Sequence, residues 1–392
     1  MIEIQQAVIL AGGRGTRLRP FSDTAPKAMY PFEGKPFLEH LIEQIKSFGI
    51  RDILLLLGYL PEKIMDYFGD GSALGVHIQY QVTPVEWETG SRLKAARSLL
   101  KEHILLLYCD NYCPIQWSRA VSQYENARLP LQITVYDNQD GYTRDNLRVS
   151  DGIVTCYDKK RETPDLHGVD IGYILMESSL VDSLPEGNIS FEQTLYPALV
   201  TEKKMGAYIT AHRYYSVGGW PRIEVTKEFF RPKKVVFLDR DGTLNCRPPK
   251  AEYITAPEEF VWLEGARQAI HLLKRKGYSL YLVTNQPGIA RNKLTIEALA
   301  DIHLKMQNEL GETGSKIDDI FLCPHGWNEG CDCRKPKPGM LYQAQKKYSL
   351  DLTRCYLIGD DERDIAAGEA VGCRCFMVDE QHSLFLLAEQ LP

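Results

Sequence analysis

The fold of the second half of the chain is decided by one stretch of sequence, Val235-Val236-Phe237-Leu238-Asp239-Arg240-Asp241-Gly242-Thr243-Leu244. Its apolar beginning is typical of a buried strand, which delivers two aspartates, one residue apart, into a glycine turn. At the end of a buried parallel strand such a pair can share one Mg2+, so that the first carboxylate is free to attack phosphorus and the second to move a proton. Taken alone, the pair is more typical of a plain strand and Asp-Gly turn, so the interpretation depends on the segments that follow.

Two further strands carry polar residues at their ends. The pattern predicts a strand over Ser279 to Val283, followed by Thr284 and Asn285. A hydroxyl at this place can hold a phosphoryl oxygen. Another strand, Cys355 to Ile358, runs into a Gly-Asp pair, and we expect Asp360 to complete the coordination of Mg2+.

Three cysteines and one histidine crowd into a short loop that leads to Arg334 and Lys335. They are Cys323, His325, Cys331 and Cys333. Four ligand-type side chains at this spacing predict a closed tetrahedral zinc site in a reducing compartment. Because all four positions would be protein ligands, the metal should be structural and should fix the loop. Thiols without metal are the alternative.

The ordered set Asp-x-Asp-Gly-Thr, Thr-Asn, Lys and Gly-Asp-x-x-x-Asp resembles the haloacid dehalogenase phosphatases over residues 233–392. The Gly-Ile-Ala-Arg loop that ends at Arg291 and the cysteine loop narrow the resemblance to the zinc-bearing branch with heptose 1,7-bisphosphate 7-phosphatase and histidinol phosphatase. The short gap between His325 and Cys331 is nearer to the histidinol enzymes, whereas Gly-Ile-Ala-Arg favours the heptose enzymes.

This resemblance implies a role for each motif residue. Asp239 is the nucleophile and becomes an aspartyl phosphate, while Asp241 protonates the leaving sugar oxygen and then activates water. Asp239, the backbone at Asp241 and Asp360 would hold Mg2+. The resemblance assigns the phosphate and substrate contacts to Thr284 and Lys335 for the transferring phosphoryl group and to Asn285, Arg291 and Arg334 for the rest of the substrate.

In the first half of the chain, an apolar strand over Ala7 to Leu10 runs into the glycine-rich loop Ala11-Gly12-Gly13-Arg14-Gly15-Thr16-Arg17-Leu18, and Pro26-Lys27 follows. Clustered glycines let backbone N–H groups approach phosphates closely, and Arg17 and Lys27 can neutralise pyrophosphate as it leaves. The compound pattern resembles the sugar-1-phosphate nucleotidylyltransferases, especially their mannose- and heptose-1-phosphate guanylyltransferase branch. The resemblance implies that the nucleotide is bound by Gly12, Gly13, Gly15 and Thr16.

Strands and helices alternate after this loop, which predicts a βα layout. The expected elements are a helix over residues 37–48, strands over 53–57, 77–82 and 104–108, helices over 62–68 and 91–100, and a hairpin over 146–160. The strand over 104–108 ends close to Asp110. Ligands bind beyond the carboxyl ends of parallel strands, and by resemblance Asp110 is the Mg2+-binding aspartate. Resemblance also assigns Lys160 to the sugar phosphate and Glu192 to sugar hydroxyls, with solvated surface charges as the alternative.

Two departures from the nucleotidylyltransferase pattern affect the predicted activity. Glu88 and Arg92 bring bulk and charge to a loop that in this family faces the nucleotide base. Ser216 stands where the family has a second Mg2+-binding carboxylate, and a hydroxyl is a much weaker Mg2+ ligand. Either another acid, Asp170 or Glu224, completes the site, or this half catalyses poorly.

Length and composition favour two domains. A chain of 392 residues exceeds what one core usually supports. A short connector with proline and lysines places the boundary near residue 231, so we expect an α/β chain with a nucleotidylyltransferase-like (Rossmann-like, GT-A-like) mixed sheet over 1–231 and a HAD-type doubly wound parallel sheet over 232–392. The net charge of -6 argues against nucleic acid or membrane partners, and the absence of a leader or a long apolar segment favours the cytoplasm. A homo-oligomer is compatible with the sequence.

The two resemblances combine into one functional hypothesis. Removal of the 7-phosphate of D-glycero-D-manno-heptose 1,7-bisphosphate yields a sugar 1-phosphate, which is the acceptor that a nucleotidylyltransferase needs. We therefore expect a Mg2+-dependent bifunctional enzyme that makes an NDP-heptose from an NTP, with GTP preferred on resemblance, for surface polysaccharide. The alternatives are a phosphatase with a noncatalytic nucleotide-sugar-binding N-terminal domain, and a histidinol phosphatase with an unrelated partner domain.

Overall fold

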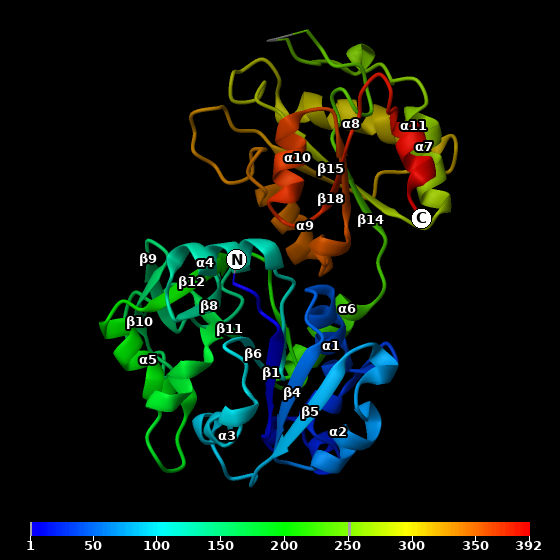
Figure 1. Cartoon of the computed structure of the whole chain (residues 1–392). Coiled ribbons are helices and arrows are strands. Elements are labelled where there is room, and N and C mark those ends of the chain that lie inside the picture. The colour runs from blue at the N-terminus through cyan, green and yellow to red at the C-terminus, as the bar shows by residue number, and fades with distance from the viewer. Residues whose placement is uncertain (1, 250–251) are drawn as a thin grey trace. The chain divides into compact units, whose positions relative to one another are not determined.

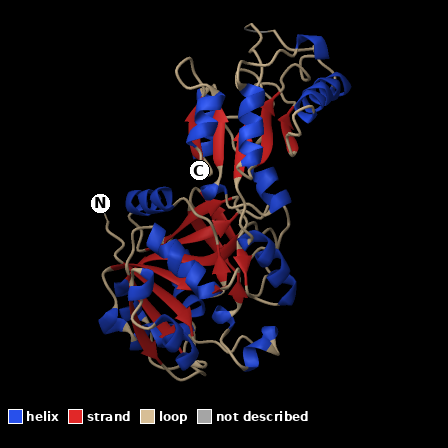
Figure 2. Cartoon of the chain, turned by 90° about the vertical axis from the view of Figure 1, so that its right-hand side faces the viewer, coloured by secondary structure: helices blue, strands red, loops and turns tan. Residues whose placement is uncertain are grey.

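The computed structural model describes residues 2–249 and 252–392. The chain divides into two compact units, Met1–Arg231 and Pro232–Pro392. In both units red strands are flanked by blue helices (Figure 2), as expected for an α/β chain. No helix among the described residues combines the length and apolar character that a membrane span requires.

The N-terminal unit is built on a mixed sheet with the strand order β5-β4-β1-β6-β11-β8-β12-β10-β9 in the described residues (Figure 1). The strands are β1 Gln6–Ala11, β4 Asp52–Leu57, β5 His77–Val82, β6 His103–Tyr108, β8 Leu131–Tyr136, β9 Leu147–Ser150, β10 Ile153–Tyr157, β11 Val169–Glu177 and β12 Met205–Thr210. Strands β5, β4, β1 and β6 run parallel, and β11 is antiparallel to β6. Two small ribbons pair β2 Pro31–Phe32 with β3 Lys35–Pro36, and β7 Asn111–Tyr112 with β13 Tyr215–Ser216.

Helices cover both faces of this sheet. One face carries α1 Phe37–Ser47, α2 Pro61–Phe68, α4 Trp117–Ala127 and α6 Trp220–Phe230, and the other carries α3 Thr89–Ala95 and α5 Phe191–Thr201. Alternate residues of β1 enter the two cores, Ile9 on one face and Val8 on the other. A strand buried on both faces reads as a continuous apolar run, which is why the sequence pattern revealed it.

The C-terminal unit has a parallel sheet of order β16-β15-β14-β17-β18 in its described part. The strands are β14 Val235–Leu238, β15 Ser279–Asn285, β16 Asp319–Cys323, β17 Tyr356–Gly359 and β18 Arg374–Met377. Helices α7 Ala266–Arg275, α8 Ile296–Gly311 and α11 Leu384–Gln390 pack in one core, and α9 Gly339–Tyr348 and α10 Glu362–Glu369 in the other. Figure 1 shows α9 and α10 on one side of the sheet and α7 and α11 on the other, which confirms a doubly wound sheet.

The strand order places the switch in chain direction at β14. From β14 the chain moves outward to β15 and β16, then returns to β17 on the other side. Ligands in open parallel sheets bind outside the carboxyl ends of the strands at such a point. Asp239 and Asp360 follow the two strands that meet there.

Most of the expected elements are confirmed, and one is wrong in its length. The helix expected over 91–100 is instead α3, Thr89–Ala95, followed by a short 3-10 helix, Arg97–Leu99. The chain turns at Ala96, and Arg97 then donates two hydrogen bonds to Asp182. Helical periodicity carries no information about that distant carboxylate.

Candidate functional site

A cluster of three carboxylates lies at the switch point of the C-terminal sheet. Asp239 follows β14, Asp360 follows β17, and Asp364 lies in the first turn of α10. One oxygen from each carboxylate lies within 4.8 Å of the others. Asp364 was not assigned from the sequence, although it is the last residue of the Gly-Asp-x-x-x-Asp motif. The carboxylate of Asp241 is not in this group.

Lys335 connects two of these acids. Its Nζ lies 2.6 Å from Oδ1 of both Asp239 and Asp364 and donates to the carbonyl of Val283 at 2.7 Å. Burial lowers the pKa of Lys335, but the two carboxylates outweigh this effect, so the amine stays charged. Burial raises the pKa of Asp239, Lys335 acts against that shift, and Asp364 adds to it.

The side chain of Asn285 holds the backbone of Lys335 in place. Its amide donates to the Lys335 carbonyl, and its carbonyl accepts from the Lys335 N–H, both at 3.1 Å. Because Asn285 ends β15, this pair of bonds ties the loop that carries the lysine to the sheet.

The side chain of Asp241 is held by a separate network. Arg240 donates to both carboxylate oxygens at 3.0 and 2.9 Å, and Asn245 and Gln286 donate at 3.0 and 3.1 Å. Burial raises the pKa of Asp241, but Arg240 and these hydrogen bonds outweigh it and hold the pKa below its ordinary value. Gln286 also donates to Thr284 Oγ1 at 2.8 Å, which orients the hydroxyl beside the acids.

The two carboxylate oxygens of Asp360 have different surroundings. Arg247 Nη2 lies 2.7 Å from its Oδ2, whereas its Oδ1 is buried without a hydrogen-bond partner in the part of the chain described here. Burial raises the pKa of Asp360 to about 6. Arg247 was not expected from the sequence, because a lone arginine after the aspartate motif carries no pattern.

A cavity of about 790 Å³ is lined in part by Asp239, Asp241 and Asp364. Arg291 and Arg334 line it, as do Thr284, Asn285 and other residues predicted from the motifs. Arg291 donates to the hydroxyl of Tyr253 at 2.6 Å. The guanidinium carbon of Arg334 lies 4.3 Å from the ring centroid of Trp327. Arg247 and Arg363 add further positive charge to the lining.

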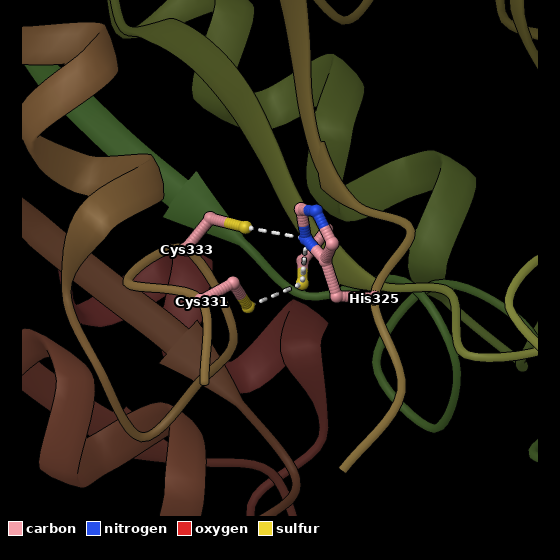
Figure 3. Close-up of side chains that lie close together, drawn as sticks. His325, Cys331 and Cys333 are labelled. Carbon is pink, nitrogen blue, oxygen red and sulfur yellow. Dashed lines mark hydrogen bonds between the residues drawn. The ribbon is translucent and has the colours of Figure 1, made fainter. Parts of the chain in front are cut away.

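The cysteine–histidine loop converges as the spacing predicted. Figure 3 shows His325, Cys331 and Cys333 pointing toward one another. The distances are 3.6 Å from Cys323 Sγ to His325 Nδ1, 3.7 Å from Cys323 Sγ to Cys331 Sγ, and 3.2 Å from His325 Nδ1 to Cys333 Sγ. Zinc–sulfur bonds of about 2.3 Å in a tetrahedron separate two sulfurs by roughly 3.8 Å, so the donors fit a four-coordinate metal. No disulfide joins any of the cysteines in the described residues.

In the N-terminal unit, Lys27 and Asp110 form a half-buried ion pair at the carboxyl ends of β1 and β6. Lys27 Nζ lies 2.6 Å from Asp110 Oδ2. Burial favours the neutral form of each group, but their mutual attraction outweighs it, so the pKa of Asp110 is lowered and that of Lys27 is raised. The charge of Arg17 acts on both groups. Gly15 has the left-handed conformation with a φ of 63° and packs on the Lys27 stem.

The two candidates for a second carboxylate each have partners of their own. Glu224 pairs with Lys227 on the exposed side of α6. Asp170 accepts from the N–H of Gly172, and burial raises its pKa to about 7. Ser216 pairs with Asn111 in the ribbon next to Asp110. Within residues 2–249 and 252–392, Asp110 belongs to no group of three or more metal-ligand side chains.

Glu192 lies in a polar group around β6 and α5. It accepts from the hydroxyls of Tyr108, Ser190 and Thr89. Lys159 Nζ lies 3.8 Å from its Oε1. The next residue, Lys160, which the resemblance assigns to the sugar phosphate, lies in a tight turn in which Asp158 accepts a hydrogen bond from its N–H.

The loop from Glu88 to Arg92 differs from the sequence expectation. Arg92 does not project into open space but is 3% exposed, with its guanidinium bonded to backbone oxygens. Glu88 is exposed and lies outside that network. Its N–H donates a hydrogen bond to Asn188 Oδ1. The bulk of the Arg92 side chain therefore lies inside the N-terminal unit and not in an open loop.

The fold and the two sites define the class of each part. Residues 6–143 match the family model described as nucleotidyl transferase, and residues 332–382 match that described as HAD-hydrolase-like. The chain is therefore a nucleotidyltransferase-type domain joined to a HAD-like phosphatase domain, which confirms both resemblances.

Similar proteins identify the family of the second domain more closely. The chain is 37% identical over 156 residues to the D-glycero-beta-D-manno-heptose-1,7-bisphosphate 7-phosphatase of Bordetella bronchiseptica, covering 40% of this chain and 86% of that one. It is 39% identical over 157 residues to the D-glycero-alpha-D-manno-heptose-1,7-bisphosphate 7-phosphatase of Photorhabdus laumondii, covering 38% and 84%. The chain belongs to the heptose-1,7-bisphosphate 7-phosphatase family.

The fold of the first domain also has a solved counterpart. HddC from Yersinia pseudotuberculosis aligns with 58% of this chain and 100% of its own at a TM-score of 0.51 and 23% identity. At this identity the similarity shows the fold alone.

Proposed function

We propose that the C-terminal domain removes the 7-phosphate of D-glycero-D-manno-heptose 1,7-bisphosphate and that the N-terminal domain transfers a nucleotidyl group, GMP from GTP, to the resulting heptose 1-phosphate. The single observation that carries the first step is the placement of Asp239, Lys335 and the Asp360–Asp364 pair at one switch point below a cavity lined by arginines. Membership in the phosphatase family supports the sugar.

The phosphatase step follows from the side chains around Asp239. Lys335 binds Oδ1 of Asp239, which leaves Oδ2 to attack phosphorus. The bond from phosphorus to the sugar oxygen breaks, and Asp241, which must first take up a proton from solvent because Arg240 holds its pKa low, gives that oxygen the proton. Water then attacks the aspartyl phosphate, Asp241 takes its proton, and the Asp239 carboxylate is released with inorganic phosphate.

The carboxylates fit a hard divalent cation. The three acids offer oxygens within 4.8 Å of one another, and the buried Oδ1 of Asp360 lacks a partner in the described residues. Oxygens around Mg2+ lie about 2.1 Å from the ion and up to about 4.2 Å apart, so a small closure suffices. Asp239, Asp360 and Asp364 would hold Mg2+, which neutralises charge on the transferring phosphoryl group.

The arginines suit a substrate with two phosphates. Thr284 and Lys335 would hold the phosphoryl group being transferred, while Arg291 and Arg334 face the same cavity and can bind the second phosphate. The zinc loop would support this arrangement, because Arg334 and Lys335 directly follow Cys333 and a bound zinc would fix their backbone.

For the nucleotidyl step, the Lys27–Asp110 pair and the glycine loop, at the carboxyl ends of parallel strands, support the binding of a triphosphate there. The sugar phosphate would attack the α-phosphorus in line, and pyrophosphate would leave against Arg17 and Lys27. Asp110 would hold Mg2+, Lys160 would bind the sugar phosphate and Glu192 the sugar hydroxyls. Lys159, with its Nζ 3.8 Å from Glu192, is a further candidate for binding the sugar phosphate. The product, an NDP-heptose, would serve surface polysaccharide.

One observation favours a second candidate, a phosphatase with a noncatalytic nucleotide-sugar-binding N-terminal domain. Ser216 adjoins Asp110 where a second carboxylate would strengthen Mg2+ binding.

The test uses the whole chain and separate readouts. Both anomers of heptose 1,7-bisphosphate and histidinol phosphate are supplied in turn, and phosphate is measured; faster release from histidinol phosphate would contradict the sugar assignment. Heptose 1-phosphate is then supplied with GTP, ATP, CTP, UTP or dTTP, and pyrophosphate is measured. No pyrophosphate with any of them would favour the second candidate. Asp239→Asn should abolish phosphate release and leave pyrophosphate release unchanged.

A further inference from the structure

The guanidinium of Arg92 is buried at the carboxyl ends of the parallel strands of the N-terminal sheet. Arg92 lies in α3, and its side chain is aimed at the turns that follow β4 and β5. Its nitrogens donate to the Leu57 carbonyl at 2.9 Å, the Thr83 hydroxyl, the Pro84 carbonyl at 3.0 Å, the Val85 carbonyl at 3.1 Å and the Trp87 carbonyl at 3.1 Å.

Two glycines let this group lie against the backbone. A β-carbon at Gly12 or at Gly58 would lie closer than 3.0 Å to the Arg92 guanidinium. Gly12 opens the glycine-rich loop, and Gly15 of the same loop packs on Lys27. The loop thus contacts Arg92 at one end and the Lys27–Asp110 pair at the other.

The oxygens around Arg92 form a site for a planar group with several N–H donors. These oxygens are neutral carbonyls and a hydroxyl, so a neutral donor edge would satisfy them without bringing a charge out of water. Among the nucleobases, guanine offers this chemistry. The nitrogens of its N1–H and of its N2 amino group are bonded to the same carbon, C2, as two nitrogens are in a guanidinium.

We propose that Arg92 occupies the place of a guanine edge and that a guanine nucleotide must displace it to bind. The proposal rests on the nucleotidyl transfer proposed above for its choice of ligand. It makes the structure described here the closed form of the site, in which the protein's own guanidinium satisfies the base-reading oxygens. The side chain then limits the affinity for the nucleotide, and the oxygens that it occupies set the preference for guanine.

The experiment measures nucleotide binding to the full chain by calorimetry, with GTP or ATP, Mg2+ and no sugar phosphate. Removing a side chain that holds the site closed should raise apparent affinity, so Arg92→Ala should bind GTP at least about tenfold more tightly than the wild type. ATP should gain much less. Methylguanidinium should compete with GTP in Arg92→Ala and not in the wild type. Arg97→Ala, an exposed arginine in the next turn, is the matched control and should behave as the wild type.

The outcomes separate this proposal from the proposed activity. Unchanged or weaker GTP binding in Arg92→Ala would overturn the displacement, and equal gains for GTP and ATP would overturn the choice of guanine. Should Arg92→Ala fail to fold, Arg92→Lys keeps the charge but loses the fork, and the same gain in GTP affinity is expected in it. Because binding is measured without turnover, a failure of nucleotidyl transfer leaves this result interpretable.

Discussion

Gly242 and Asp360 are packed so closely that a β-carbon on Gly242 would lie less than 3.0 Å from the Asp360 carboxylate. Gly242 also has a φ of 95°, a conformation that L-residues with side chains rarely adopt. The turn after the aspartate motif is therefore tied to the position of an acid more than a hundred residues away in sequence.

Substitution of Gly242 by alanine should displace Asp360 and remove phosphatase activity. Misplacement of a reacting or metal-binding group by about 1 Å can cost roughly 10²-fold in rate, and we expect at least that loss of phosphate release. Gly277→Ala is the matched control, because Gly277 has a φ of 84° but faces open space. Comparable losses in both variants would show that backbone strain, and not the contact with Asp360, is responsible.

Lys335→Met should abolish phosphate release and destabilise the C-terminal domain. Breaking a buried ion pair by removing one partner costs about 3–5 kcal/mol, since the remaining charges stay uncompensated. Thermal unfolding followed with and without Mg2+ should show a larger Mg2+-dependent gain in Tm in Lys335→Met than in the wild type. Lys337→Met, an exposed lysine in the same loop, should change neither quantity. Full activity in Lys335→Met would remove this lysine from the mechanism.

Removal of one ligand from the cysteine–histidine group should release zinc and loosen the loop. Purified wild-type chain should carry about one zinc, and Cys331→Ser substantially less, with a fall of several degrees in Tm. Metal analysis by atomic emission and calorimetry provide the two readouts. Cys246→Ser, which changes an exposed cysteine outside the group, should retain the metal. Equal zinc content in Cys331→Ser and the wild type would argue for thiols without metal.

His303 should make the stability of the C-terminal domain depend on pH. It is buried, and burial together with Arg240 lowers its pKa to about 4. As pH falls from about 6.5 toward 4, His303 is protonated in the unfolded chain but stays neutral in the folded domain. The free energy of unfolding should therefore fall by about 3 kcal/mol. The measurement is the unfolding free energy of the wild type minus that of His303→Gln at each pH. A difference that stays constant over this range would contradict the prediction.

Asp110→Asn should separate the two activities. Loss of the carboxylate should lower pyrophosphate release by roughly 10²- to 10³-fold, as expected when a group that stabilises transition-state charge is removed. Phosphate release should not change. Lys35→Met, in an exposed ion pair of the same domain, serves as the control. A parallel fall in both activities would indicate that the variant damages the whole chain.

The sequence alone predicted the parts whose signals are local. The β14 strand is a short apolar run before a glycine turn, and the four zinc-type ligands lie within eleven residues, so neighbours in sequence are also neighbours in space. The glycine loop after β1 could be recognised for the same reason. These features depend on backbone preferences and side-chain types over a few residues.

Only the tertiary structure decided which polar groups meet. Asp364 joins Asp239 because α10 begins just after β17, the strand that pairs with β14. Lys159 rather than Lys160 reaches Glu192, and Arg92 lies against Gly12 instead of in a solvent-facing loop. Each of these contacts depends on strand order and on where a helix begins, which are settled by packing between segments far apart in the chain. A short-range pattern cannot encode such distances, and the chemistry of both sites depends on them.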